Sequence, residues 1–370
     1  MLRRLISRVG IPRSAGHESS SPTSNLWISP SAGDELVGHS HGWSALFNKR
    51  SNDLFLSDPL SHRRINLPPI HALPDPSFNL DIHGRGSVSK VVLSSSPDDD
   101  DCRAMVSFGP ANRLAFCVPG RSSKWIPLGH SFFDHNTKYP FQRYARVHDD
   151  LVYCTRRRVF TSITACHLHF PHLILYMNAS DSFSTERWDW DVRDPDFPKL
   201  VAQEGLDIRK FADGPTRIWL DMNKEVLEKE CVQVPHLVYA EESDQLFIVM
   251  RFVRMRMGIV PRCEFRGLMG EGETFGFIVV EIKKDKDKYG HRICTTEDDL
   301  NGMAMFVGNG SAISAAASHK FNPNSIYFTD SKRIPRLHTA NDNGVFDYAT
   351  KTTTIGESFK RHPFGFGLVV

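Results

Sequence analysis

A serine between two glycines is the first residue in this chain with a chemical precedent. The segment Gly38-His39-Ser40-His41-Gly42 matches G-x-S-x-G, the pattern in which α/β-hydrolases hold a nucleophilic serine. That chemistry needs a strained turn between a strand and a helix. The residues before this segment are rich in Ser, Pro and Gly, and those after it have the pattern of a strand. We therefore interpret residues 38–42 as a linker that enters the first strand, with a hydrolase as the alternative.

A second group is the histidine cluster Cys166-His167-Leu168-His169-Phe170-Pro171-His172. In a strand, His167 and His169 would share one face, because successive side chains point to opposite sides. Two such imidazoles bind zinc or iron when a carboxylate joins them, and Asp181 and Glu186 are nearby acids. We interpret the cluster as a polar edge strand and assign no metal, with a metal site as the alternative.

Arginines recur between residues 143 and 256 and form the third group. They stand at 143, 146, 156–158, 251, 254 and 256, and lysines at 283, 284, 286 and 288 form a predicted hairpin tip. Arginine interleaved with aromatic residues such as Phe252 is typical of single-stranded RNA binding. Acids at 149, 150, 285 and 287 lie close by in the sequence. We expect solvated, balanced charge, with RNA or an acidic protein as alternative partners.

The sequence lacks the motifs of most other metal-binding and catalytic sites. Seven cysteines are widely and irregularly spaced with no C-x-x-C, which indicates reduced, buried thiols rather than disulfides or a zinc ribbon. The sequence holds no phosphate-binding loop, no H-E-x-x-H, no G-x-G-x-x-G after a strand and no kinase signature. We therefore predict a protein that is not an enzyme, with no catalytic, cofactor-binding or metal-binding residues.

The elements that would position these residues are short strands. Apolar and β-branched runs at 43–47, 54–56 and 63–67 are separated by turn signals, and the same pattern returns at 90–93, 104–108, 114–118 and 125–128. Predicted hairpins pair 148–153 with 159–164, 237–239 with 245–250, 275–282 with 291–295, and 325–329 with 344–348. Helices are expected only at 221–230 and in an Ala-rich turn at 311–319. Residues 181–196 are too polar for a strand set, and we interpret them as a surface excursion.

Repeated four-stranded modules of about 45–50 residues indicate a β-propeller. We predict an all-β chain that forms a single propeller of six or seven four-stranded blades, with few short helices. The domain division is 1–40 for a leader and linker, and 41–370 for the propeller.

Several segments resemble a large plant family of F-box-associated proteins with a KIB-type β-propeller. They are the runs at 42–43, 54–60, 65–70, 90–95 and 114–120, then Phe306-Val307-Gly308-Asn309-Gly310-Ser311, 322–330 and 343–347. The resemblance implies a propeller without family-wide catalytic residues. Many members resemble substrate-recruiting subunits of ubiquitin ligases, which carry an N-terminal F-box. The residues before Gly42 show no F-box-type helix, so this chain is similar to the organellar branch that lacks it.

The N-terminus supports an organellar address. Residues 1–30 hold four arginines and one acid, and Leu2, Leu5, Ile6 and Val9 lie on one helical face opposite Arg3, Arg4 and Arg8. Serines follow Pro12. This Arg-rich, acid-poor, amphipathic start is typical of a transit peptide. We predict mitochondrial import, with plastid, or cytoplasm and nucleus, as alternatives.

The composition of the chain limits the classes of partner that we expect it to bind. The 370 residues include 45 basic and 43 acidic side chains, so a strongly basic nucleic-acid protein is excluded. No apolar run is long enough to span a membrane. The resulting expectation is a monomeric, non-catalytic propeller that binds an unknown protein in an organelle. The alternatives are a substrate-recruiting factor for ubiquitin ligation and an RNA-binding or metal-dependent organellar protein.

Overall fold

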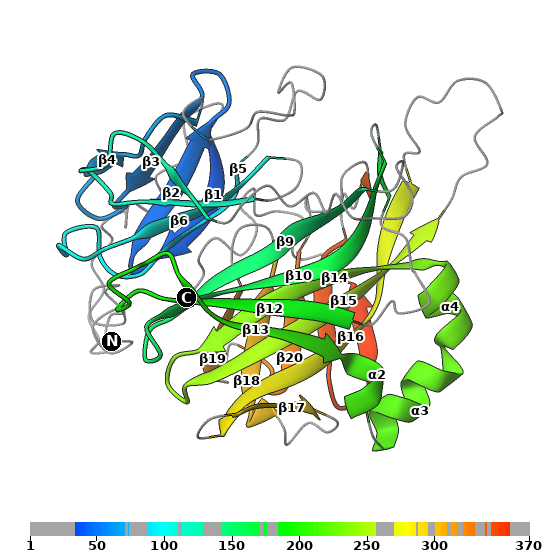
Figure 1. Cartoon of the computed structure of the whole chain (residues 1–370). Coiled ribbons are helices and arrows are strands. Elements are labelled where there is room, and N and C mark those ends of the chain that lie inside the picture. Colours follow the sequence, from blue (N-terminus) through cyan, green and yellow to red (C-terminus); the bar gives the residue numbers. More distant parts are fainter. Residues whose placement is uncertain are drawn as a thin grey trace, which may run out of the picture.

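A computed structural model describes residues 34–70, 73, 88–109, 113–128, 143–170, 173–175, 184–212, 214–256, 270–285, 288–294, 300–308, 312–316, 321–329, 337–338 and 342–355. In these ranges the chain is β-structure apart from three short α-helices and isolated turns. The sheets follow one another in chain order, and the helices lie at one end of them (Figure 1). None of the helices in these ranges has the length and apolar character that crossing a membrane requires.

The first three sheets are antiparallel and use consecutive parts of the chain. The first contains β1 (Asp34–Ser40), β2 (Trp43–Asn48), β3 (Asp53–Ser57) and β4 (Arg64–Asn66). The second contains β5 (Val88–Leu93), β6 (Ala104–Phe108), β7 (Arg113–Cys117) and β8 (Ile126–Pro127). The third contains β9 (Arg143–Cys154), β10 (Val159–Phe170), β12 (Ser184–Asp191) and β13 (Leu200–Asp207), with β11 (Leu173–Leu175) beside the end of β10.

The fourth and fifth sets of strands are joined in one ten-stranded sheet. The fourth is the antiparallel series β14 (Cys231–Ala240), β15 (Gln245–Arg256), β16 (Gly270–Asp285) and β17 (Lys288–Cys294). The fifth contains β18 (Met303–Val307), β19 (Ala312–Ala316), β20 (Ser325–Phe328), β22 (Gly344–Asp347) and β23 (Thr352–Ile355). A single parallel pair, Tyr239 with Ile313, connects the two sets, and β21 (Leu337–His338) pairs with the start of β16.

The inner sheets each lie between two apolar cores, as a propeller requires. On β6, Ala104 and Val106 face the core shared with the first sheet, while Met105 between them faces the core shared with the third. On β15, Ile248 packs toward the third sheet and the helices, while Val249 packs toward the fifth set of strands. The alternation of side chains along a strand therefore places apolar residues on both faces, so that a sheet packs against both of its neighbours.

The first strands of successive sheets lie side by side, with β1 next to β5, β5 next to β9 and β9 next to β14. Asp150 of β9 joins three of them. Its Oδ1 accepts hydrogen bonds from Lys90 Nζ at 2.7 Å and from Leu151 N, and its Oδ2 accepts one from Leu237 N at 2.8 Å. Because both charged side chains are almost fully buried, this ion pair is a structural link between the second, third and fourth sheets.

The all-β class, the blade-like sheets and the four predicted hairpins are confirmed by the strand pairing. The predicted helix at 221–230 corresponds to α4 (Lys224–Lys229) and the last two residues of α3 (Gly214–Met222), while the rest of α3 and the one-turn α2 (Ile208–Phe211) were not predicted. The described strands form five sets, where we expected six or seven. The reason is that the third and fourth sets use strands of up to 16 residues, so each takes more of the chain than an average blade.

Two interpretations of polar segments were wrong. Residues 184–191 of the supposed surface excursion form β12, which pairs with β10 and β13 inside the third sheet. Residues 38–40 of the supposed linker belong to β1, so the first described strand, which starts at Asp34, lies within the segment assigned to the leader and linker. In β12 the alternate residues Trp188 and Trp190 enter an apolar core. The buried Arg187 forms ion pairs with the buried Asp189 at 3.4 Å and with the partly exposed Glu204 at 3.2 Å, so its charge is paired inside the sheet.

A third correction concerns the Ala-rich stretch at 311–319. Residues 312–316 form β19, which pairs with β18 along its full length. Alanine favours a helix in isolation, but here the neighbouring strand decides the conformation.

Candidate functional site: the turn face

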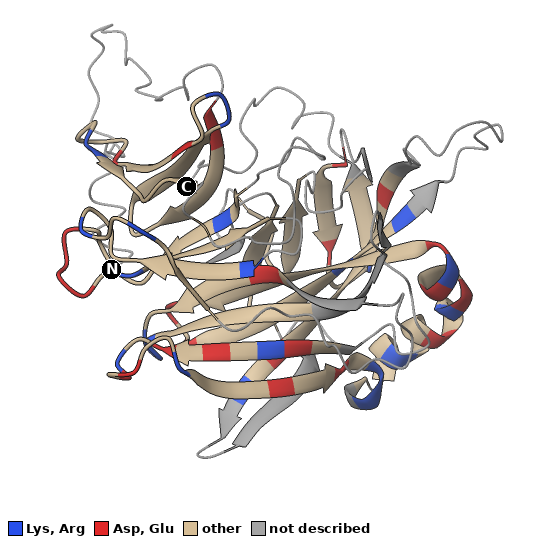
Figure 2. Ribbon diagram, turned by 45° about the horizontal axis from the view of Figure 1, so that its top comes forward, with Lys and Arg blue, Asp and Glu red and all other residues tan. Residues whose placement is uncertain are grey.

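The turns that leave the first strand of four successive sheets meet at one end of the molecule. We call this end the turn face and define it by residues 41–42, 94–103, 155–158 and 241–244. Helices α2–α4 connect β13 to β14 and lie at the opposite end (Figure 1). The described ends of the predicted tip, residues 283–285 and 288, also lie on the side of the turn face, because Ile282 pairs with Leu246 at the start of β15. Among the described residues, charged ones concentrate on the turns and the helices, while most of the strand ribbon is uncharged (Figure 2).

Ion pairs connect the first three sheets across the turn face. Arg63 of the first sheet pairs with Asp98 of the second at 2.5 Å. Arg158 of the third sheet pairs with Asp101 of the second at 3.3 Å. A hydrogen bond from Leu93 N to Ser40 Oγ, 3.3 Å long, lies near these pairs. Each exposed pair contributes little stability by itself, but together they fix the turns relative to one another.

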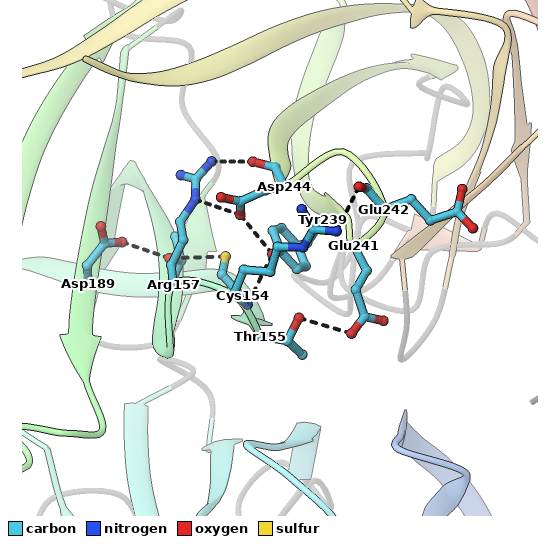
Figure 3. A network of polar contacts seen from close by, with 10 residues as sticks. Cys154, Thr155, Arg157, Asp189, Tyr239, Glu241, Glu242 and Asp244 are labelled. Carbon is cyan, nitrogen blue, oxygen red and sulfur yellow. Dashed lines mark hydrogen bonds and ion pairs between the residues drawn. The ribbon is translucent and has the colours of Figure 1, made fainter. Parts of the chain in front are cut away.

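The third and fourth sheets are joined by a denser polar network, shown in Figure 3. Arg157 donates to Asp244 twice, from Nη2 to the backbone oxygen at 2.7 Å and from Nε to Oδ1 at 3.2 Å. Tyr239 donates to Asp244 Oδ1 at 2.8 Å and accepts from the backbone nitrogen of Arg156 at 3.3 Å. Thr155 Oγ1 donates to Glu241 Oε1 at 3.0 Å. The turn at 155–158 is therefore held to the turn at 241–244 by side chains and backbone together.

Burial shifts the pKa values of three side chains in and next to the turn face. Burial, and after it the hydrogen bond to Asp244, raises the pKa of Tyr239 to about 12. Burial lowers the pKa of His41, against the opposing fields of Glu241 and Asp99. Burial and the neighbouring His41 lower the pKa of His39. At neutral pH the phenol and both imidazoles are therefore uncharged, and the fixed charge of the turn face comes from its carboxylates and guanidiniums.

Ser40, the serine of the G-x-S-x-G segment, does not have the surroundings of a hydrolase nucleophile. Ser40 ends β1, and the turn at 41–42 leads into strand β2 rather than a helix. Gly38 has a packing role instead, because a Cβ on it would lie 2.0 Å from Val91 O of the adjacent first strand. His39 Nδ1 lies 3.4 Å from Ser44 Oγ on the paired strand, at the limit of a hydrogen bond.

The histidine cluster lies partly outside the described residues. The backbone of β10 includes His167 and His169, two residues apart on one strand, as expected. Their side chains, with those of Cys166, His172 and Asp181, lie outside the described part. Glu186 is on β12, where its Oε2 accepts a hydrogen bond from Gln203. Within the ranges the structure describes, no three His, Cys, Asp or Glu side chains form a metal-binding group.

Two of the arginines that suggested RNA binding are paired with acids, one in the core and one at the surface. Arg251 is fully buried and binds Asp342, Thr274 and the backbone oxygen of Thr329, and Phe252 is buried as well. Arg254 pairs with Glu230 at 2.6 Å. An arginine and an aromatic ring in the core cannot contact a nucleic acid, so Arg251 and Phe252 do not support the RNA alternative, and our expectation of solvated charge was wrong for Arg251. The side chains of Arg143, Arg146 and Arg256 lie outside the described part.

The thiols agree with the sequence prediction as far as they are described. Five described cysteines are buried, reduced thiols: Cys102, Cys117, Cys154, Cys231 and Cys294. Burial raises the pKa of Cys154 and of Cys231 to about 12. These thiols are protonated at neutral pH and pack as small apolar residues.

Sequence reasoning missed the network around Tyr239 and Asp244. Its partners are separated by more than 80 residues in the sequence, and only the placement of two sheets side by side brings them together. The available signal was limited to a run of arginines in one predicted turn and a run of acids in another.

The match to a family model agrees with this architecture. The family described as KIB1-4 beta-propeller matches residues 12–347. No protein in the curated comparison matches the chain. A solved structure titled Kuenenia stuttgartiensis Hydrazine Synthase is similar over 71% of this chain and 55% of that one, with 13% identity and a TM-score of 0.33. The chain thus spans about half the length of that protein. From the family match over most of its length, the chain belongs to the KIB1-4 beta-propeller family.

Proposed function

We propose that this protein is a non-catalytic interaction module whose turn face binds a partner protein. The observation that carries the proposal is the cross-linking of turns from four sheets by ion pairs and hydrogen bonds. Loops on a rigid scaffold are common binding sites, because little conformational entropy is lost when they meet a partner. Exposed carboxylates on these turns, such as Asp99 and Glu242, and exposed guanidiniums, such as Arg156, supply charge for selectivity.

The partner can be identified by proximity labelling from the full chain. We expect the double variant Asp99→Lys with Glu242→Lys to lose the labelled partners, because it reverses two exposed charges on the turn face. The matched control, Asp221→Lys with Glu225→Lys, makes the same charge change at the opposite end and should keep them. Purified partner should then bind wild type and control more tightly than the turn-face variant. An unchanged set of labelled proteins in the turn-face variant contradicts the proposal, and labelled ubiquitin-ligase subunits would favour the recruiting-factor alternative.

We further propose that the protein acts in mitochondria. The support is the arginine-rich, acid-poor amphipathic start of the sequence. Replacing Arg3, Arg4 and Arg8 with Glu removes the positive face, and the expected result is a fluorescent fusion that stays in the cytosol. Lys49→Glu with Arg50→Glu, at two exposed cations outside the leader, is the control and should leave import intact. Organellar fluorescence in the triple variant contradicts the proposal, and plastid fluorescence of the wild type supports the other organelle.

A further inference from the structure

We propose that the exposed side of α3 is the contact surface of a weak homodimer, in which this helix packs antiparallel against α3 of a second copy of the chain. The surface lies on the helices that connect β13 to β14, at the end of the molecule opposite the turn face (Figure 1). The dimer does not depend on the function proposed for the turn face, and it differs from the monomer that we expected from the sequence.

One side of α3 presents apolar side chains to solvent. Ile218 and Met222 are 59% and 81% exposed, and Met222 is the most exposed of the large apolar side chains in the described part of the chain. Pro215, one turn before Ile218, is also exposed. At about 100° per residue these three side chains fall within about 60° of one another around the helix, so they form a continuous apolar stripe.

The other side of α3 fixes the helix to the body of the protein. Leu220 is buried in the core that the helices share with the third and fourth sheets, and the centre of the Trp219 ring lies 5.8 Å from that of Phe252. Asn223 Nδ2 donates to Trp219 O at 2.8 Å, which satisfies a carbonyl in the last turn of the helix. Because the helix is already formed and held in place, it loses little conformational entropy when a partner covers the stripe.

The charges beside the stripe favour a second copy of the chain as the occupant. Arg217 and Asp221 lie on one flank of the stripe, about 40° apart around the helix. Their side chains are 64% and 67% exposed, and Arg217 Nε lies 4.0 Å from Asp221 Oδ2. This distance is too long for a hydrogen bond, so both charged groups keep their donors and acceptors available to a partner.

Two-fold symmetry makes this pair of charges self-complementary. In antiparallel helices related by a two-fold axis, the same flank of each helix meets, and residues equally far from the axis on opposite sides of it become neighbours. An axis level with Trp219 therefore places Arg217 of each copy beside Asp221 of the other, and the two apolar stripes face each other. The nine-residue helix is only about 14 Å long, so the contact is smaller than the roughly 800 Å² per copy of a stable dimer, and we expect weak, reversible association.

The test is sedimentation velocity of the full chain over a concentration series up to about 0.5 mM, which populates a dimer whose dissociation constant lies in the micromolar range. Met222→Asp should abolish self-association, because it places a carboxylate in the stripe without entering the core. The matched control Leu60→Asp places the same charge at another exposed apolar residue, 60% exposed in the turn between β3 and β4, and should associate as wild type does. Thermal unfolding of each variant verifies that it is folded.

A second readout depends on the charges. Arg217→Asp and Asp221→Arg should each raise the dissociation constant of the dimer about tenfold or more, because each variant places like charges together twice across the axis. An equimolar mixture of the two variants should form a heterodimer with the wild-type constant, since every cation then meets an acid again.

Three results overturn the proposal: a wild type that stays monomeric over the whole concentration series, a Met222→Asp variant that associates as wild type does, or a mixture of the charge variants that associates no better than each alone. A monomeric wild type whose proximity-labelled partners are lost in Met222→Asp also overturns it, because the stripe would then bind a different protein.

Discussion

At the scale of single residues, Arg251 is the side chain on which the junction of the fourth and fifth sets of strands depends. Its Nε donates to Thr274 Oγ1 at 2.8 Å, and its Nη2 donates to Asp342 Oδ2 at 2.7 Å. The guanidinium also lies 4.9 Å from the centre of the Phe328 ring. A buried arginine is tolerated here because its guanidinium meets both hydrogen-bond acceptors and an aromatic face.

Replacing Arg251 with Met should strongly destabilise the protein, because it leaves the carboxylate of Asp342 buried without its cation. We expect a loss of about 3–5 kcal/mol in the free energy of unfolding, measured by urea denaturation. The control is Arg254→Met on the same strand, whose pair with Glu230 is largely exposed and should cost about 1 kcal/mol or less. Equal losses of unfolding free energy in the two variants would mean that burial of the Arg251 pair adds nothing to the stability of the protein.

At the scale of elements, close packing of the first strands determines where glycine is needed. Gly38 of β1 lies against Val91 O of β5, so a side chain at residue 38 would force the first two sheets apart. Gly205 of β13 is also in a strand, but it faces open space among the described residues. The two glycines therefore separate the effect of contact between sheets from the general effect of glycine in a strand.

Gly38→Ala should lower the free energy of unfolding by about 1–3 kcal/mol, the usual cost of overpacking. Gly205→Ala should be neutral or slightly stabilising, because alanine reduces the freedom of the unfolded chain. Both variants are compared with wild type by thermal and urea unfolding. The packing argument is wrong if Gly38→Ala is as stable as Gly205→Ala.

The elements also show what could be predicted from sequence. The hairpins of the fourth sheet were predicted correctly because apolar runs and turn residues are local signals. β12 was missed because its charged residues suggested solvent, although the alternation of Trp188 and Trp190 with Arg187 and Asp189 is the period of a strand. Contacts across the turn face were not predicted, since they depend on how the turns of neighbouring sheets are aligned, which local sequence patterns do not show.

At the scale of the whole molecule, the cores form a series in which every sheet is stabilised by the next. The core between the first and second sheets is followed by that between the second and third, and the series continues to the fifth set of strands. Such repeats owe much of their stability to contacts between neighbours. A polar group that touches three sheets at once should therefore influence the unfolding of all of them.

Asp150 is such a group, and Asp150→Ala tests how the sheets are coupled. The variant leaves Lys90 as a buried cation and removes the acceptor for Leu237 N, so we expect a loss of about 3–5 kcal/mol in the free energy of unfolding. Native-state hydrogen exchange should show faster opening of β5, β9 and β14 together. Glu35→Gln, which removes a more exposed pair with Lys49, is the control and should change exchange little. If only β9 opens faster, Asp150 is a local support, and the coupling between sheets lies in the apolar cores alone.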